Sequence, residues 1–198
     1  MKKLLFVILL MGTLACHAQQ VIMDKQEANG DRDIATSSVI FTQDKGLLGT
    51  GVKYDISMMF SRTKHDSLYS DSYLILLPLK LLTSRSLDVG RKLLLKTQND
   101  SIIELVNTLP IKTTDNAYEI IGHTIVYTLE PYYGAGPSQI QQIINGGIKK
   151  LRIELNTGAF DLQPNDKNKF WNFSLAVKMC YDCIQKRLKY NNDLRNGF

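Results

Sequence analysis

The sequence predicts an α+β protein: a mainly antiparallel, curved β-sheet or open β-sandwich, with one short helix and one long C-terminal helix packed on the sheet. Two observations lead to this class. Through most of residues 36–162, short runs of β-branched, aromatic and alternating apolar residues are separated by turn residues, a pattern typical of strands. Residues 166–190 instead repeat apolar positions at helical spacing, which predicts one long helix at the end of the chain.

The N-terminus has the features of a secretory signal peptide, predicted over residues 1–18. Met1-Lys2-Lys3 is basic, the run from Leu4 to Met11 is apolar, and small and polar residues follow up to a cleavage site after Ala18. The apolar run is shorter than the roughly 20 residues that a membrane-spanning helix needs. We therefore expect a periplasmic or secreted protein. Since Thr13-Leu14-Ala15-Cys16 loosely resembles a lipobox, lipidation of Cys16 and an outer-membrane lipoprotein are the alternative.

Charge and cysteine content exclude some classes of protein. Removing residues 1–18 takes away two lysines and no acid, so the net charge falls from +5 to +3. This mild excess favours solubility and does not indicate a nucleic-acid partner. Two cysteines then remain with Cys16 lost or lipidated, which excludes a framework of several disulfides.

The first part of the mature chain is expected to form strands. Residues 19–35 are a polar lead-in that can include a short strand, and residues 37–43 are strand-like. In residues 52–62 the alternation predicts a half-buried strand. Its buried face is expected to contain Val52, Tyr54, Ile56 and Met58.

Turn residues divide the middle of the chain into further strands. We expect a polar turn at 63–72, and in the apolar run 73–82 Pro78 should end the strand or place it at an edge. A hairpin is predicted over 91–109, with its turn at 98–101. Residues 117–129 continue the strand pattern, with Gly122 as a bulge or bend.

The C-terminal part combines both helices with two more strands. After a turn at 130–137, residues 138–145 predict a short helix capped by Ser138 and stopped by Gly146-Gly147. In 148–155 the alternation places Leu151, Ile153 and Leu155 on the buried side, and a short strand follows. The long helix, 166–190, is expected to bury a stripe formed by Phe170, Phe173, Val177, Cys180, Ile184 and Leu188. With 191–198 as a frayed tail, residues 36–190 are expected to form a single domain.

Three segments together show a resemblance to known proteins. They are GDRDIATSS (30–38), GRKLLLKTQNDSIIEL (90–105) and SQIQQIINGGIKKLRIELNTGAFDL (138–162), the last followed by a helix. In this pattern the chain resembles a group of small secreted or periplasmic proteins of Bacteroidetes without a characterised function. The resemblance covers most of the mature chain and implies export and a strand-rich fold. It implies no catalytic residue.

Cys180 and Cys183 form a C-x-x-C pair near the end of the long helix. A redox pair needs the activating position at a helix N-terminus, whereas Cys180 lies about four turns into the predicted helix. Positions i and i+3 of a helix also place the Cβ atoms farther apart than a disulfide requires, and a zinc site would need two further ligands. We interpret the pair as core residues, with a Cys180–Cys183 disulfide as the alternative.

Tyr132, Tyr133 and His123 are the candidate binding residues. Two tyrosines in a loop rich in proline and glycine offer flat aromatic surfaces with polar tips, which can bind sugars or protein partners. The alternative is a connecting loop whose tyrosines cover the short helix. His123 is interpreted as a hydrogen-bonded histidine of the sheet, with a catalytic base as the alternative.

No spacing of His, Cys, Ser or acidic residues meets a known catalytic geometry. The serine, histidine and acid of KHDS (64–67) are adjacent in sequence, so their side chains diverge. We therefore expect a non-enzymatic binding or structural module of the cell envelope, with an envelope or extracellular ligand of unknown identity and no cofactor or metal. A hydrolase using a carboxylate pair or His123 is the alternative, because Glu104, Glu119, Glu130, Glu154 and Asp161 lie on or near predicted strands.

Overall fold

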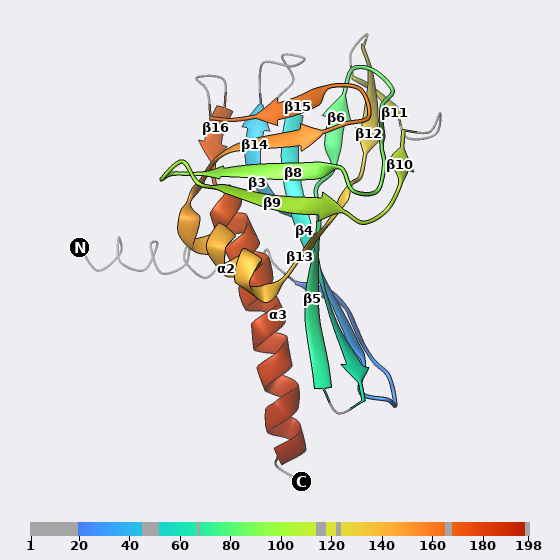
Figure 1. Cartoon of the computed structure of the whole chain (residues 1–198), viewed down its shortest axis with the longest axis vertical. Coiled ribbons are helices and arrows are strands. Elements are labelled where there is room, and N and C mark those ends of the chain that lie inside the picture. Colours follow the sequence, from blue (N-terminus) through green and yellow to red (C-terminus); the bar gives the residue numbers. More distant parts are fainter. Residues whose placement is uncertain are drawn as a thin grey trace, which may run out of the picture.

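The computed structural model shows an α+β fold in which an antiparallel sheet contacts a short helix and a long C-terminal helix (Figure 1). The structure describes residues 20–44, 52–66, 68–113, 118–121, 124–164 and 168–196. The fold class predicted from the sequence is thus confirmed. The signal peptide predicted over residues 1–18, with Cys16, lies outside the described residues and stays a prediction.

Eleven described strands form the main sheet, and every pair of neighbours is antiparallel. Nine follow one path across it, in the order β1 (Val21–Gln26), β2 (Arg32–Thr36), β4 (Val52–His65), β5 (Leu68–Leu76), β13 (Tyr132–Ala135), β9 (Ile102–Asn107), β8 (Lys92–Thr97), β14 (Ile148–Glu154) and β15 (Ala159–Leu162). The other two are β3 (Val39–Asp44), which pairs with β4, and β16 (Asn168–Trp171), which pairs with β3.

The long strand β4 connects two parts of this sheet. Its first half pairs with β3 and its second half with β2, while β5 follows its other edge. At the change of partner the Thr36 hydroxyl accepts a hydrogen bond from the Met58 N–H at 3.1 Å and lies 3.3 Å from the Met58 carbonyl, to which it can donate. Figure 1 shows the result: a curled upper sheet, from which β4 and β5 extend downward as an arm.

Two small sheets flank the main one. One consists of β6 (Leu79–Leu81), β12 (Thr124–Leu129) and β11 (Tyr118–Ile121). The other consists of β7 (Ser86–Leu87) and β10 (Ile111–Lys112). As predicted, strand structure stops before Pro78, since β5 ends at Leu76 and β6 begins at Leu79. The strand pattern expected over 117–129 is present as two strands, β11 and β12, which pair with each other in antiparallel orientation.

Strand pairing extends further than the sequence pattern indicated. Residues 63–72 are not a polar turn, because the ladder between β4 and β5 continues to the pair His65–Leu68. The lead-in 19–35 contains β1 and most of β2, which pair with each other. Polar side chains do not prevent backbone hydrogen bonding at an exposed end of a sheet, so the period-two signal fades there while the strands persist.

The short helix α2 (Pro137–Gly146) confirms the helix predicted over 138–145. Its cap differs from the expected one: the N-cap is Gly136 rather than Ser138, and the Gln139 side chain accepts a hydrogen bond from the Gly136 N–H at 2.9 Å. Pro137 takes the first helical position, where a missing N–H costs nothing. The helix ends, as expected, at glycine, with Gly147 in the left-handed conformation (φ 60°).

The long helix α3 (Phe173–Asn196) begins later and ends later than the predicted range 166–190. The preceding segment is strand β16, because Trp171 lies opposite Thr42 of β3 and donates a hydrogen bond from Nε1 to the Ile148 carbonyl at 2.6 Å. At its other end, helix α3 includes residues 191–196, which were expected to belong to a frayed tail. With 24 residues the helix is about 36 Å long.

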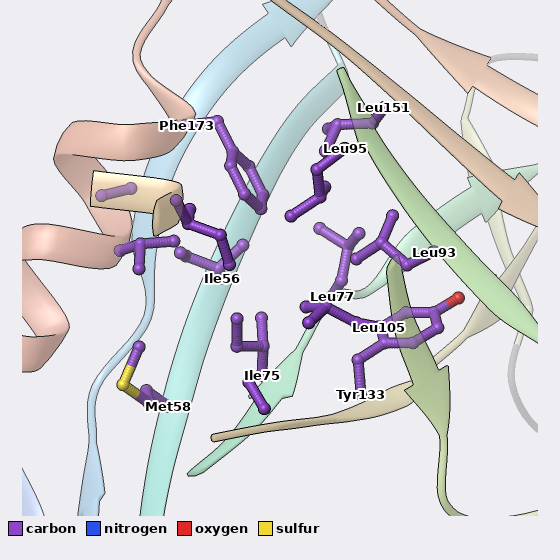
Figure 2. Packing of buried hydrophobic residues seen from close by; sticks show 14 of the residues in the cluster. Ile56, Met58, Ile75, Leu77, Leu93, Leu95, Leu105, Tyr133, Leu151 and Phe173 are labelled. Atoms are coloured by element: carbon purple, nitrogen blue, oxygen red, sulfur yellow. The ribbon is translucent and has the colours of Figure 1, made fainter. Parts of the chain in front are cut away.

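The hydrophobic core lies between the curled sheet and α3. Figure 2 shows Leu93 and Leu95 of β8, Leu151 of β14 and Phe173 of α3 facing one another across it. The alternation predicted for 52–62 and 148–155 is confirmed, since the residues expected on the inner faces are all buried: Val52, Tyr54, Ile56, Met58, Leu151, Ile153 and Leu155. The α3 stripe is confirmed for Phe173, Val177, Cys180, Ile184 and Leu188, while Phe170 lies on β16.

Candidate ligand-binding cleft

The two tyrosines singled out in the sequence lie on a central strand of the sheet. Residues 130–137 were expected to form a turn, but Tyr132–Ala135 is β13, paired with β5 and β9 on its two edges. Because successive residues of a strand point to opposite faces, Tyr133 enters the core and is fully buried, while Tyr132 is half-buried on the other face. The structure therefore does not join the two rings in one aromatic surface.

The Tyr133 hydroxyl has no hydrogen-bond partner among the described residues, although its ring is surrounded by the core (Figure 2). Burial, and next the negative charge of Glu154, raise the pKa of Tyr133 well above its usual value. The hydroxyl is therefore a neutral group in an apolar environment. The backbone of Tyr132 is held by Asn107, whose side-chain oxygen accepts the Tyr132 N–H at 3.1 Å.

His123 and Cys16 lie outside the described residues, so their roles stay predictions. His65 is exposed at the end of the β4–β5 arm. Within the described ranges, no group of three His, Cys, Asp or Glu side chains is arranged to hold a metal ion.

Both cysteines of the C-x-x-C pair lie on α3 with free thiols. Cys180 is fully buried in the apolar stripe, and Cys183 is half-buried beside it. Since α3 begins at Phe173, Cys180 is about two turns into the helix rather than four, but still beyond the first turn, where the helix dipole acts most strongly. Burial raises the pKa of Cys183, although the positive charge of Lys186 opposes this. The disulfide alternative stays a prediction.

Two of the five carboxylates considered for a hydrolase, Asp161 and Glu104, are paired with cations on the solvent face of the sheet. Asp161 accepts two hydrogen bonds from Arg152, both at 2.8 Å, and Lys150 lies 3.0 Å away. These contacts, the Arg152 hydrogen bond first, lower the pKa of Asp161 to about 2. Glu104 pairs with Lys92 at 2.7 Å. A general acid needs the opposite environment, one that keeps its carboxyl group protonated near neutral pH.

A different site is formed by the β8–β9 turn and the end of α2. This cleft has a volume of about 450 Å³. Figure 1 shows α2 next to the turn that joins β8 and β9. The cleft is lined by Thr97, Asn99, Ser101, Ile102, Ile103, Gln142, Asn145 and Gly146.

The turn and the helix are fixed against each other. The Gln98 N–H donates to the Gly146 carbonyl at 3.1 Å, which links the turn to the last residue of α2. A Cβ atom at Gly146 would lie 2.8 Å from Cγ2 of Thr97, so only glycine permits this close approach. Within the turn, Asp100 has φ 67°, and its N–H donates to the Thr97 carbonyl. The cleft is therefore held in shape by the fold itself.

Neutral polar groups line the cleft. Gln142 and Asn145, one helical turn apart on α2, contribute two exposed side-chain amides without a hydrogen-bond partner in the described part of the chain. Asn99 and Ser101 contribute an amide and a hydroxyl from the turn, and Ile102, 60% exposed, contributes apolar surface. None of the described lining residues has a titratable side chain. Such a surface can form hydrogen bonds but offers no group for acid–base or metal chemistry.

Sequence reasoning missed this cleft. Its two halves, 97–103 and 142–146, are brought together only by the packing of α2 on the sheet. One signal was present: Gln142 and Asn145 share a helix face opposite the buried Ile140 and Ile143. Amides on a solvent face are common, so this signal by itself does not identify a site.

Comparisons of the chain with models of protein families, with curated proteins and with solved structures gave no match. Within the described ranges, neither helix has the length and apolar character needed to cross a membrane. The chemistry of the site is therefore the basis for a functional conclusion.

Proposed function

We propose that this protein is an exported, non-enzymatic binding module of the cell envelope, and that its ligand is a neutral carbohydrate. The observation that carries the proposal is the lining of the cleft between the β8–β9 turn and α2: three side-chain amides, two hydroxyls and two isoleucines, with no titratable group. The signal features of residues 1–18 support a periplasmic or secreted location of the protein, and a lipoprotein anchored through Cys16 is the alternative.

Carbohydrate fits this lining because each sugar hydroxyl is both a donor and an acceptor. A primary amide offers two N–H donors and a carbonyl acceptor, so it can match one or two neighbouring hydroxyls. The exposed side of Ile102 can contact the C–H groups of a sugar ring. A charged ligand would instead require a cation or an anion in the cleft.

A peptide ligand is less well matched to this site. Peptides commonly add as a strand to a free sheet edge, but β8 already pairs with β9 and β14, and β9 with β8 and β13. The backbone hydrogen-bonding groups beside the cleft are thus engaged within the sheet. The Thr97 hydroxyl is bonded to Asn99 Oδ1 within the turn. The groups left for a ligand are the side-chain amides of Gln142 and Asn145, the NH₂ group of Asn99 and the Ser101 hydroxyl.

The proposal is tested with a glycan array followed by calorimetric titration of the oligosaccharides that bind. Gln142→Ala and Asn145→Ala should each weaken binding roughly two- to tenfold, the effect of losing one hydrogen bond. Gln141→Ala is the matched control, because Gln141 is an exposed glutamine of the same helix that does not line the cleft.

Three outcomes would contradict this function. Binding that is equally strong in the wild type and in Gln142→Ala and Asn145→Ala would place the ligand elsewhere. Cleavage of the bound oligosaccharide, detected by mass spectrometry, would favour the hydrolase alternative. A glycan array without any bound oligosaccharide would count against carbohydrate as the ligand class.

A further inference from the structure

The C-terminal half of α3 has a second face beside its buried stripe. Cys183, Lys186, Arg187 and Tyr190 follow one another at i, i+3, i+4 and i+7, so they lie along one side of the helix. They line a cleft of about 290 Å³ together with Val21 of the edge strand β1. In Figure 1, α3 continues well past α2. This cleft and the cleft beside the β8–β9 turn have no lining residue in common.

The walls of this cleft are apolar. They consist of the Val21 side chain, the Cys183 thiol, the Tyr190 ring and the aliphatic stems of Lys186 and Arg187. Long basic side chains commonly cover apolar surface with their stems while their charged ends remain in water. A ligand in this cleft would therefore contact hydrocarbon along its length and positive charge at the opening.

The charge at the opening is fixed and unbalanced. Asp24 accepts hydrogen bonds from Arg32, both at 3.0 Å, and from Arg187 at 2.5 Å, so one carboxylate neutralises one of two guanidinium groups. The Arg187 guanidinium also lies 5.7 Å from the centre of the Tyr190 ring, which holds its orientation. Lys186 is exposed and has no ion-pair partner among the side chains that the structure describes, which on α3 end at Tyr190.

We propose that this cleft binds a free fatty acid, with the aliphatic chain between α3 and Val21 and the carboxylate at Lys186 and Arg187. Apolar walls favour a saturated chain, since burying each CH₂ group contributes about 0.8 kcal/mol. The excess of positive charge selects an anionic head group. This site is separate from the carbohydrate cleft, and neither proposal depends on the other.

Cys183 provides a direct readout of occupancy, because it lines the cleft while Cys180 is fully buried. The purified, reduced protein is treated with a maleimide in increasing dodecanoate below its micelle concentration, and peptide mass spectrometry follows Cys183 alone. The reaction at Cys183 should slow in proportion to the occupied fraction. Dodecyl maltoside, which has the same chain and a neutral head group, should protect far less.

Variants locate the carboxylate. Lys186→Gln should raise the Kd for dodecanoate roughly two- to fivefold, the effect of losing one partly exposed charge contact. Lys189→Gln is the control, since Lys189 is exposed on the same helix and does not line the cleft. Rates with and without ligand are compared within each variant, because Lys186 itself affects the thiol pKa.

Three results would overturn the proposal: no protection of Cys183 by dodecanoate, equal protection by the maltoside, or equal losses of affinity in Lys186→Gln and Lys189→Gln. Protection by vesicles containing phosphatidylglycerol, but not by free dodecanoate, would also overturn it and indicate a membrane surface as the partner.

Discussion

Replacing Tyr133 by phenylalanine removes one buried oxygen atom and leaves the aromatic ring in place. Tyr133 is fully buried, and its hydroxyl has no hydrogen-bond partner among the described residues. In water the same hydroxyl is fully hydrated, so the folded protein loses that hydration without replacing it. Tyr133→Phe should therefore stabilise the protein.

The size of the effect follows from the cost of burying an unpaired polar group, about 1–3 kcal/mol. Some of this cost is offset by dispersion contacts of the oxygen, so we expect the free energy of unfolding to rise by about 1 kcal/mol. For a chain of this length that corresponds to an increase in Tm of roughly 2–4 °C. The measurement is urea unfolding and calorimetry of wild type and variant at pH 7.

Tyr73→Phe is the matched control with the opposite sign. Tyr73 is also buried, but its hydroxyl accepts a hydrogen bond from Nε2 of Gln185 at 3.1 Å. Removing it leaves the amide of Gln185 without this partner and should lower the free energy of unfolding by about 1 kcal/mol. If Tyr133→Phe were as destabilising as Tyr73→Phe, the Tyr133 hydroxyl would have a partner, and the reasoning about its environment would be refuted.

Three further predictions concern charge and thiols. Asp24→Asn should lower the free energy of unfolding by about 3 kcal/mol, because it leaves the guanidinium of Arg32, 7% exposed, without its anion. The same change at the exposed Asp161 should lower it by less than about 1 kcal/mol. Equal losses in the two variants would contradict the argument that burial of the ion pair sets the size of the effect. The hydrogen bond from its arginine partner holds the pKa of Asp161 at about 2 in the folded protein, below the value near 3.9 of an unfolded chain. The ionised Asp161 therefore contributes to the free energy of unfolding above about pH 4, and this contribution is lost as the pH falls toward 2. Between about pH 5 and pH 2, Asp161→Asn should lose less stability than the wild type. In the reduced native protein Cys183 should react with maleimide, whereas Cys180 should react only in denaturant; equal rates would show that Cys180 is not in the core.

The parts of the fold that could be predicted are those with one buried face. The alternation around Ile56 and Ile153 and the spacing of Val177 and Ile184 identify strands and a helix without knowledge of their partners. In each case the apolar period of the sequence equals the structural period, because the core lies on one side only.

The parts that could not be predicted depend on distant partners. β13 is recognisable as a strand only once β5 and β9 lie on its two edges, since its Pro/Gly-rich sequence is typical of a turn. β16 likewise precedes α3 because Trp171 packs against Phe41 of β3, with ring centres 5.8 Å apart. The proposed carbohydrate cleft has the same origin, because its residues come from segments about 40 positions apart and form no local motif.

The central claim is that the cleft between the β8–β9 turn and α2 binds a neutral carbohydrate. The most direct measurement is a titration of the ¹⁵N-labelled protein with a bound oligosaccharide, followed by NMR of the side-chain amide groups. The account predicts shifts at the NH₂ groups of Asn99, Gln142 and Asn145 and none at Gln141. Shifts that spare these three amides and gather on another surface would contradict it.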